Sequence, residues 1–91
     1  MYTIHASSKF RRDVRRCNRQ QKDMDKFKEI SELLEAGSPL PEKNKDHLLS
    51  GNWNDHKECH IEPDWLLIYK IDEDEAVLEF VRMGSHSELF G

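Results

Sequence analysis

The sequence predicts an α+β fold in which an N-terminal pair of helices packs on a small antiparallel β-sheet. Two patterns support this prediction. Apolar residues recur every three or four positions up to residue 36, as on a helix, and short apolar segments joined by tight turns follow from residue 57, as in a sheet. A chain of 91 residues can bury one modest core, so we expect residues 1–91 to form a single domain.

The composition predicts a folded protein with a charged surface. Hydrophobic residues make up 36% of the chain and charged residues 35%, and aromatic and branched residues are frequent enough to argue against disorder. No apolar run approaches the roughly 20 residues of a membrane span, and the N-terminus lacks the layout of a signal peptide. We therefore expect a cytoplasmic protein with no membrane partner, whose two cysteines, Cys17 and Cys59, stay reduced.

The first 36 residues predict one short strand and two helices. Residues 2–5 alternate as a strand does, and Ser7 or Ser8 can cap the helix that follows. The apolar stripe of this first helix consists of Phe10, Val14 and Cys17. A stronger stripe predicts a second helix over residues 22–36, ended by Gly37; its members are Met24, Phe27, Ile30, Leu33 and Leu34. Because the joint is short, we expect an antiparallel hairpin with both stripes on one surface.

The remaining residues predict an irregular connection followed by three strands. Glycine, serine, proline and asparagine punctuate residues 37–44, which lead to segment 46–49 and a turn at 50–52. Strand patterns cover residues 57–61, 65–71 and 77–83. Tight joints make these strands antiparallel neighbours, and strand 65–71, which is apolar on both faces, is expected at the centre of the sheet.

Charge is divided unevenly along the chain. The net charge is -4, but residues 1–28 carry nine Lys or Arg against three Asp, a net of +6, and the remaining residues carry five basic and fifteen acidic groups, a net of -10. Such a basic block suggests a face for a polyanion such as nucleic acid, although a solvated basic helix gives the same pattern. The arginines proposed for this face are Arg11, Arg12, Arg15 and Arg16.

Polar side chains gather at the ends of the predicted strands. Alternation along residues 57–61 places Glu58 and His60 on the face opposite Cys59 and Ile61, so His60 is not expected to fill the core. Other polar residues lie at strand ends or in adjoining loops, and strand ends can meet at one rim. The candidates for that rim, besides His60, are His47, Asp64, Arg82 and His86.

Each candidate also has a purely structural interpretation that the residues leave open. Asp64 after a proline is typically a turn residue, and Arg82 could form a surface ion pair. His5 and His56 are assigned no function. A zinc site has no recognised ligand spacing here, and adjacent strand residues point opposite ways, so no metal ligand is predicted; the residues considered for zinc are His47, His56, Cys59 and His60.

Three segments resemble the YafQ branch of the RelE/ParE superfamily of bacterial toxin-antitoxin toxins. They read DHLLSGNW at residues 46–53, ECHIEPDWLLIY at 58–69 and RMGSHSELF at 82–90. The resemblance covers nearly the whole chain in order and implies the RelE-like fold, two helices on a small antiparallel sheet. It further implies a ribosome-dependent endoribonuclease that cuts mRNA in the ribosomal A site, without a metal or other cofactor.

The resemblance also implies roles for individual residues. RNA cleavage without a metal needs a base for the ribose 2′-hydroxyl, a cation for the phosphate and an acid for the leaving 5′-oxygen. We expect His60 with Asp64, or His47, on the base side and His86 on the acid side. Arg82 would bind the phosphate and Phe90 would help to place the substrate. Trp65 is a candidate for stacking on a base, although its apolar neighbours favour a place in the core.

The resemblance implies a cognate, DinJ/RelB-like antitoxin that silences the toxin, with operator DNA bound only through that antitoxin. The chain departs from the family in its net acidic charge and in Lys57, where arginine is more usual. If the arginines of the first helix face the ribosome, the acidic strand turns can face elsewhere. Two other functions stay open: a ParE-like gyrase inhibitor, which needs no acid and base, and an inactive homologue that acts with its antitoxin in transcriptional autoregulation.

Overall fold

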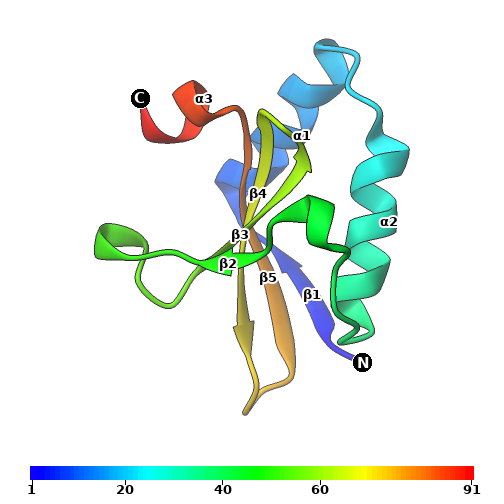
Figure 1. Ribbon diagram of the computed structural model, residues 1–91, viewed down its shortest axis with the longest axis vertical. Helices are drawn as coiled ribbons and strands as arrows, with labels where there is room; N and C mark the ends of the chain where they lie inside the picture. Colours follow the sequence, from blue (N-terminus) through cyan, green and yellow to red (C-terminus); the bar gives the residue numbers. More distant parts are fainter.

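A five-stranded sheet forms the centre of the computed structural model, which describes residues 1–91 (Figure 1). The strand order is β1-β5-β4-β3-β2, so β4 is central, as the sequence predicts. β3, β4 and β5 are antiparallel neighbours. The strands are β1 (Thr3–Ala6), β2 (His47–Leu48), β3 (Lys57–Glu62), β4 (Trp65–Asp72) and β5 (Val77–Gly84).

The sheet is mixed rather than wholly antiparallel, because β1 runs parallel to β5, with Thr3 opposite Val77 and Ala6 opposite Phe80. Tight turns fix the directions of β3, β4 and β5, whereas β1 is joined to β5 only through the rest of the chain. Its direction is therefore set by tertiary packing. The two-residue strand β2, which was expected as part of a connection, extends the opposite edge by pairing with β3.

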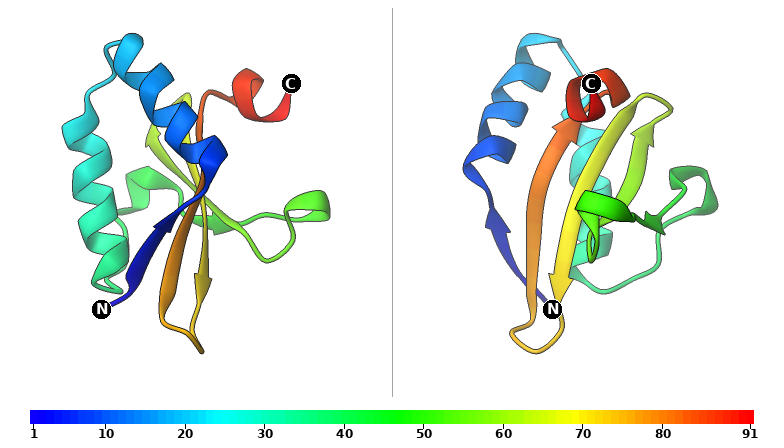
Figure 2. Two further views of the ribbon diagram at one scale, coloured as in Figure 1. Left: turned by 180° about the vertical axis from the view of Figure 1, so that it is seen from behind. Right: turned by 90° about the vertical axis from the view of Figure 1, so that its left-hand side faces the viewer.

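The two expected helices form a hairpin on one face of the sheet (Figure 2). α1 spans Ser8–Arg19, and its N-cap Ser7 accepts a hydrogen bond from the Phe10 N–H at 3.0 Å. α2 spans Met24–Glu35 with Asp23 as its N-cap. The chain turns away at Gly37, whose φ of 73° is the left-handed conformation that glycine adopts at least cost.

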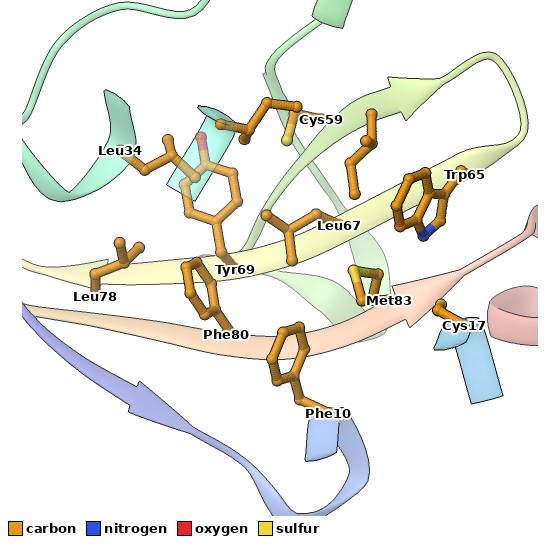
Figure 3. Close-up of a cluster of buried hydrophobic side chains, with 12 residues drawn as sticks. Phe10, Cys17, Leu34, Cys59, Trp65, Leu67, Tyr69, Leu78, Phe80 and Met83 are labelled. Atoms are coloured by element: carbon orange, nitrogen blue, oxygen red, sulfur yellow. The ribbon is translucent and has the colours of Figure 1, made fainter. Parts of the chain in front are cut away.

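The main core lies between the helix hairpin and the sheet, as Figure 3 shows. Three aromatic rings, Phe10 from α1, Phe27 from α2 and Phe80 from β5, meet with centroids 5.2 to 5.8 Å apart. Tilted and edge-on contacts at these distances are favourable for aromatic pairs. They join both helices to the sheet, so the two apolar stripes share one surface, as expected.

A smaller core covers the other face of the sheet. It contains Leu66 and Ile68 of β4 and Leu89 of α3 (His86–Phe90), with Trp53 packed against them. α3 and the residues that follow β2 lie on the opposite side of the sheet from α2 (Figure 1). α3 follows the last predicted strand, in a segment for which the sequence predicted no element, and Ser85 and Glu88 form a capping box at its start. None of the helices has the length and apolar character needed to cross a membrane.

Candidate active site

His86 and Asp64 make a two-point contact where α3 begins. Asp64 lies in the β3–β4 turn, and its Oδ1 accepts hydrogen bonds from the His86 backbone N–H at 2.9 Å and from His86 Nδ1 at 2.7 Å. The backbone bond and then the ring bond lower the pKa of Asp64 below its usual value. With Nδ1 donating to the carboxylate, His86 Nε2 is left for a substrate.

His60 lies in the second half of β3, with an oxygen atom near each ring nitrogen. Nδ1 contacts the Pro63 carbonyl at 3.2 Å, and Nε2 lies 3.3 Å from Oε1 of Glu58. The Glu58 side chain is only 6% exposed. Glu58 and His60 share the face opposite Cys59, as strand alternation predicts.

His47, the first residue of β2, is held by the loop that precedes this strand. Its Nδ1 lies 2.6 Å from the carbonyl of Lys45, which accepts the Nδ1–H and leaves Nε2 unbonded. The adjacent Asp46 anchors the loop to the sheet: it accepts a hydrogen bond from the Tyr69 hydroxyl and pairs with Lys57 Nζ at 2.9 Å. Burial, together with the bond to Asp46, raises the pKa of Tyr69, so its hydroxyl keeps the proton that it donates.

The three histidine rings form a row that continues to Phe90. Ring centroids are 6.3 Å apart between His47 and His60, 5.8 Å between His60 and His86, and 6.5 Å between His86 and Phe90. The Phe90 side is open, with 45% of the residue exposed. The expectation that these histidines meet at one rim is therefore correct.

One expected pairing is not found. Asp64 contacts His86 rather than His60, because His86 is the first residue of α3 and its backbone N–H needs an acceptor outside the helix. Sequence spacing places Asp64 four residues after His60, but the β-bulge between His60 and Glu62 changes the register before the turn. Asp64 is thus the partner of the residue expected on the acid side.

Arg82 lies on β5, two strands away from β3, which carries His60. In the sheet register it pairs with Ile68 of β4, which pairs with Glu58 of β3, and Glu58 in turn pairs with His47. Two strand spacings, about 10 Å, thus separate the backbones of Arg82 and Glu58. Its guanidinium binds Asp13 of α1 through Nε at 2.7 Å and Nη2 at 3.2 Å, and Nη1 makes no bond.

Two residues proposed for RNA or ribosome contact are unsuitable. Trp65 is fully buried in the main core, where a base cannot reach it. Arg16 is partly buried and is committed to Asp13 at 2.8 Å and to Glu88 at 3.1 Å. The other basic candidates of α1 are exposed, namely Arg11, Arg12 and Arg15.

Sequence reasoning missed Asp13 and the pairing of Glu58 with His60. Asp13 occupies a position on the apolar stripe of α1, three residues after Phe10 and four before Cys17. A carboxylate at such a position must be paired when it is buried, so its place on the stripe was an available signal. Burial would raise the pKa of Asp13, but hydrogen bonds from Arg82, the Met83 N–H and Arg16 outweigh this effect and lower it.

One group of side chains could hold a metal ion. Ligand atoms of Glu58, His60 and His86 all lie within 4.8 Å of one another. Two imidazoles and a carboxylate are a ligand set that zinc and copper accept. Cys59, considered for zinc from the sequence, points to the other face, and burial raises the pKa of its thiol to about 12. The possible ligand set therefore differs from the one that sequence spacing suggested.

The sequence profile of a family described as bacterial toxin of type II toxin-antitoxin system, YafQ, matches residues 2–91. This chain belongs to the YafQ family. It is 42% identical over 89 residues to the mRNA interferase toxin YafQ of Escherichia coli strain K12, a match that covers 97% of this chain and 95% of that one. The resemblance seen in the three sequence segments is confirmed.

Solved structures of similar proteins share the fold along the whole chain. YafQ in the crystal structure of the Escherichia coli DinJ-YafQ complex has a TM-score of 0.91 and 40% identity, with 100% of both chains covered. A metal-bound toxin from Helicobacter pylori has a TM-score of 0.94 and 42% identity, with 99% of this chain and 100% of that chain covered. The predicted α+β fold is thus that of the YafQ family.

Proposed function

We propose that this YafQ-family chain is an mRNA interferase, the toxin of a type II toxin-antitoxin pair, and that it cuts mRNA in the ribosomal A site. The row of three histidine rings at one rim of the sheet is the observation that carries the proposal. The name of the Escherichia coli relative supports the same activity. Since ribosomes lie in the cytoplasm, the protein acts there.

His86 is the general acid in this proposal. Asp64 accepts the Nδ1–H, which fixes the ring, and the imidazolium form that the acid role requires gives its Nε2 proton to the leaving 5′-oxygen. The His86–Asp64 pair is exposed, with 54% and 67% of the two side chains accessible, so it contributes little to stability. The pair therefore serves to orient the His86 ring, in the way that a carboxylate orients the histidine of other acid-base pairs.

His47 is the general base. Its Nδ1 donates to Lys45, so the unbonded Nε2 can take the proton of the ribose 2′-hydroxyl. The 2′-oxygen then attacks phosphorus, the bond from phosphorus to the 5′-oxygen breaks, and His86 gives that oxygen its proton. The products are a 2′,3′-cyclic phosphate and a free 5′-hydroxyl. A phosphate beside His60 has His47 on one side and His86 on the other, which suits in-line displacement.

Two side chains can contact the phosphate. His60 lies at the centre of the row, between the other two histidine rings. Arg82 supplies a guanidinium whose Nη1 is free. Phe90, which is exposed beside His86, offers its ring face to a base of the mRNA. These groups supply a base, an acid and charge stabilisation, so the cleavage is proposed to proceed without a metal.

The exposed arginines of α1 provide the ribosome contact. Arg11, Arg12 and Arg15 can bind phosphates of ribosomal RNA, although the whole chain carries a net charge of -4. The partner that silences the toxin is a DinJ/RelB-like antitoxin, by analogy with the DinJ-YafQ complex of Escherichia coli, and operator DNA is bound only through it.

A translating extract tests the proposed reaction. Wild type, His86→Gln and a control, His5→Gln, are compared by mapping mRNA ends with and without a chelator; His5 lies on β1, in none of the histidine-ring contacts of the row. Codon-spaced cuts by wild type and the control, insensitive to chelator and reduced at least about 100-fold in His86→Gln, support the proposal. Equal cleavage by all three overturns it.

Growth measurements separate the two other functions that the sequence left open. Growth arrest with intact mRNA would point to a gyrase-directed toxin. No arrest would point to an inactive homologue that acts through its antitoxin. Both outcomes contradict the nuclease proposal.

A second function is favoured by one specific observation. Glu58, His60 and His86 have the spacing of metal ligands, and a similar toxin from Helicobacter pylori is described as metal-bound. Zinc or copper bound there would take His86 out of its acid role and His60 out of contact with the phosphate, since a metal occupies the nitrogen lone pair. Metal binding at this site would therefore inhibit cleavage.

A further inference from the structure

A buried carboxylate on α1 connects the helix to the strand that carries Arg82. The Asp13 side chain is 4% exposed, and its two oxygens accept four hydrogen bonds. The donors are Arg16 Nη1 at 2.8 Å, Arg82 Nε at 2.7 Å, Arg82 Nη2 at 3.2 Å and the Met83 backbone N–H at 3.0 Å. Charged hydrogen bonds of this kind are among the strong ones in proteins, so they hold the Asp13 carboxylate in one position.

These contacts take the place of a missing strand. β1 pairs with β5 only as far as Ala6 opposite Phe80, so the edge of β5 beyond that pair has no neighbouring strand. Side chains from α1 and from its N-cap form hydrogen bonds with the backbone groups of this edge instead. Ser7 Oγ donates to the Val81 carbonyl at 2.8 Å, Asp13 accepts from the Met83 N–H, and Arg16 Nη2 donates to the Met83 carbonyl at 2.5 Å.

The same network limits what Arg82 can do. Two of its three guanidinium nitrogens are held by Asp13, so the side chain has one orientation and offers a phosphate the two N–H groups of Nη1 and the second N–H of Nη2. A guanidinium that is free in solution would lose rotamer freedom on binding, whereas Arg82 has already been ordered by folding. Asp13 thus fixes Arg82 before the substrate arrives.

Arg16 extends the network to the helix that carries His86. Its Nε lies 3.1 Å from Glu88 Oε2 without the alignment of a hydrogen bond, so this contact is an ion pair. Gln20 donates to the same oxygen at 2.9 Å. Glu88 Oε1 accepts from the Ser85 N–H at 2.8 Å and so closes the capping box of α3. α1 therefore fixes the start of α3, where His86 lies.

Gly84 makes this arrangement possible. A Cβ at this position would lie 2.4 Å from Arg16 Nη2 and 2.9 Å from Glu88 Oε1. Any larger residue would thus occupy the space through which Arg16 reaches Met83 and Glu88. The close approach at Gly84 is further evidence that α1 packs tightly against β5, which carries Arg82, and α3, which carries His86.

We infer that Asp13 is a positioning residue that fixes Arg82 for phosphate binding, and that Arg16 positions the helix carrying His86. The inference rests on the proposed roles of Arg82 and His86 in cleavage. Neither Asp13 nor Arg16 touches the substrate; each acts through another side chain. α1 thus has two separate sets of charged residues, an exposed one for the ribosome and a buried one for the active site.

A double-mutant cycle tests the part played by Asp13. Single-turnover cleavage is measured at saturating ribosomes for wild type, Asp13→Asn, Arg82→Ala and the double variant, with His5→Gln as control. We expect Asp13→Asn to slow cleavage about 10- to 100-fold, the scale of a misplacement of about 1 Å, with ribosome affinity unchanged. In the Arg82→Ala background the same substitution should change the rate less than about twofold. Equal loss in both backgrounds, with the proteins folded at the assay temperature, overturns the inference.

The outcomes distinguish this inference from the proposed function. If Arg82→Ala cleaves as wild type does, the phosphate role of Arg82 fails, and the inference fails with it. If Arg82→Ala is slow but Asp13→Asn is not, only the inference fails.

Hydrogen exchange of the arginine side chains needs no variant and so remains informative if Asp13→Asn does not fold. Slow exchange of the Arg82 Nε–H in the wild type supports the bond to Asp13. Exchange as fast as that of exposed Arg11 overturns it.

Discussion

Asp64 binds His86 twice through a single oxygen, once at the backbone N–H and once at the ring Nδ1. The β3–β4 turn therefore determines both where α3 starts and which ring nitrogen of its first residue faces the carboxylate. A turn residue and a helix terminus, 22 positions apart in the chain, act as one unit.

Asp64→Asn should lower the cleavage rate at saturating ribosomes about 100-fold or more. The amide oxygen can still accept hydrogen bonds, but it lacks the negative charge that stabilises a doubly protonated His86 ring, the form that the acid role requires. Asp74→Asn, which removes an exposed carboxylate from the β4–β5 turn, is the matched control. Comparable rates for Asp64→Asn and Asp74→Asn would contradict an orienting role.

The acid and the base can be separated with a substrate in which the leaving 5′-oxygen is replaced by sulfur. A thiolate leaves without protonation, so His86→Gln should regain most of its activity on this substrate. His47→Gln should stay slow, because the 2′-hydroxyl still has to lose its proton. If His47→Gln recovers its activity and His86→Gln does not, His47 is the acid and His86 is the base.

Combined replacement of Arg11, Arg12 and Arg15 by Gln should weaken ribosome binding and reduce its salt dependence. Each lost phosphate contact lowers the slope of log affinity against log salt concentration by about 0.7 to 0.9, so the expected reduction is about 2 to 3. Binding is measured by cosedimentation at several salt concentrations. Lys70→Gln, an exposed charge on β4, serves as control. A slope equal to that of wild type would exclude this face as the contact.

Asp13 should make the free energy of unfolding dependent on acid pH. Because its pKa is lowered in the folded state, its stabilising contribution is present above the unfolded-state pKa, about 3.9, and is lost as pH falls through the folded-state value. Asp13→Asn should cost about 3 kcal/mol at pH 7 and flatten the acid limb of the curve. Urea unfolding between pH 7 and pH 3 measures both effects. An unchanged acid limb would mean that other carboxylates cause it.

Zinc or copper should bind the folded protein and slow cleavage, and a chelator should restore the wild-type rate. Glu58→Gln should weaken the binding measured by calorimetry at least about tenfold, because it removes the only anionic ligand of the three. Glu62→Gln, on the same strand, is the control. Equal metal affinity of the two variants would place the metal elsewhere.

Much of the fold could be predicted because local patterns determine it. The stripes on α1 and α2 and the tight joints between β3, β4 and β5 fix elements whose partners are close in sequence. The direction of β1 could not be predicted in this way, because its partner β5 is distant in the chain. α3 was missed, although its Ser85 and Glu88 have the spacing of a capping box, because the segment is only five residues long.

The site could be predicted less completely. The histidines were found because they lie at strand ends, but their partners depend on contacts between distant segments. His86 forms a hydrogen bond with Asp64, and Arg82 forms one with Asp13. No local sequence pattern links the two members of either pair. Arg16 belongs to the basic block of the sequence. Close packing of α1 against β5 at Gly84 nevertheless places its guanidinium against the Met83 carbonyl. Counting charge along the chain cannot distinguish such a residue from its exposed neighbours.

The unpaired edge of β5 also has a consequence for the protein in solution. Edge strands with free N–H and C=O groups are templates on which other chains add strands and aggregate. Ser7, Asp13 and Arg16 occupy those groups in this protein, so the residues that hold Arg82 also cap a surface on which self-association could begin. Variants that lose Asp13 should therefore form aggregates at lower concentration than variants that lose only the catalytic histidines.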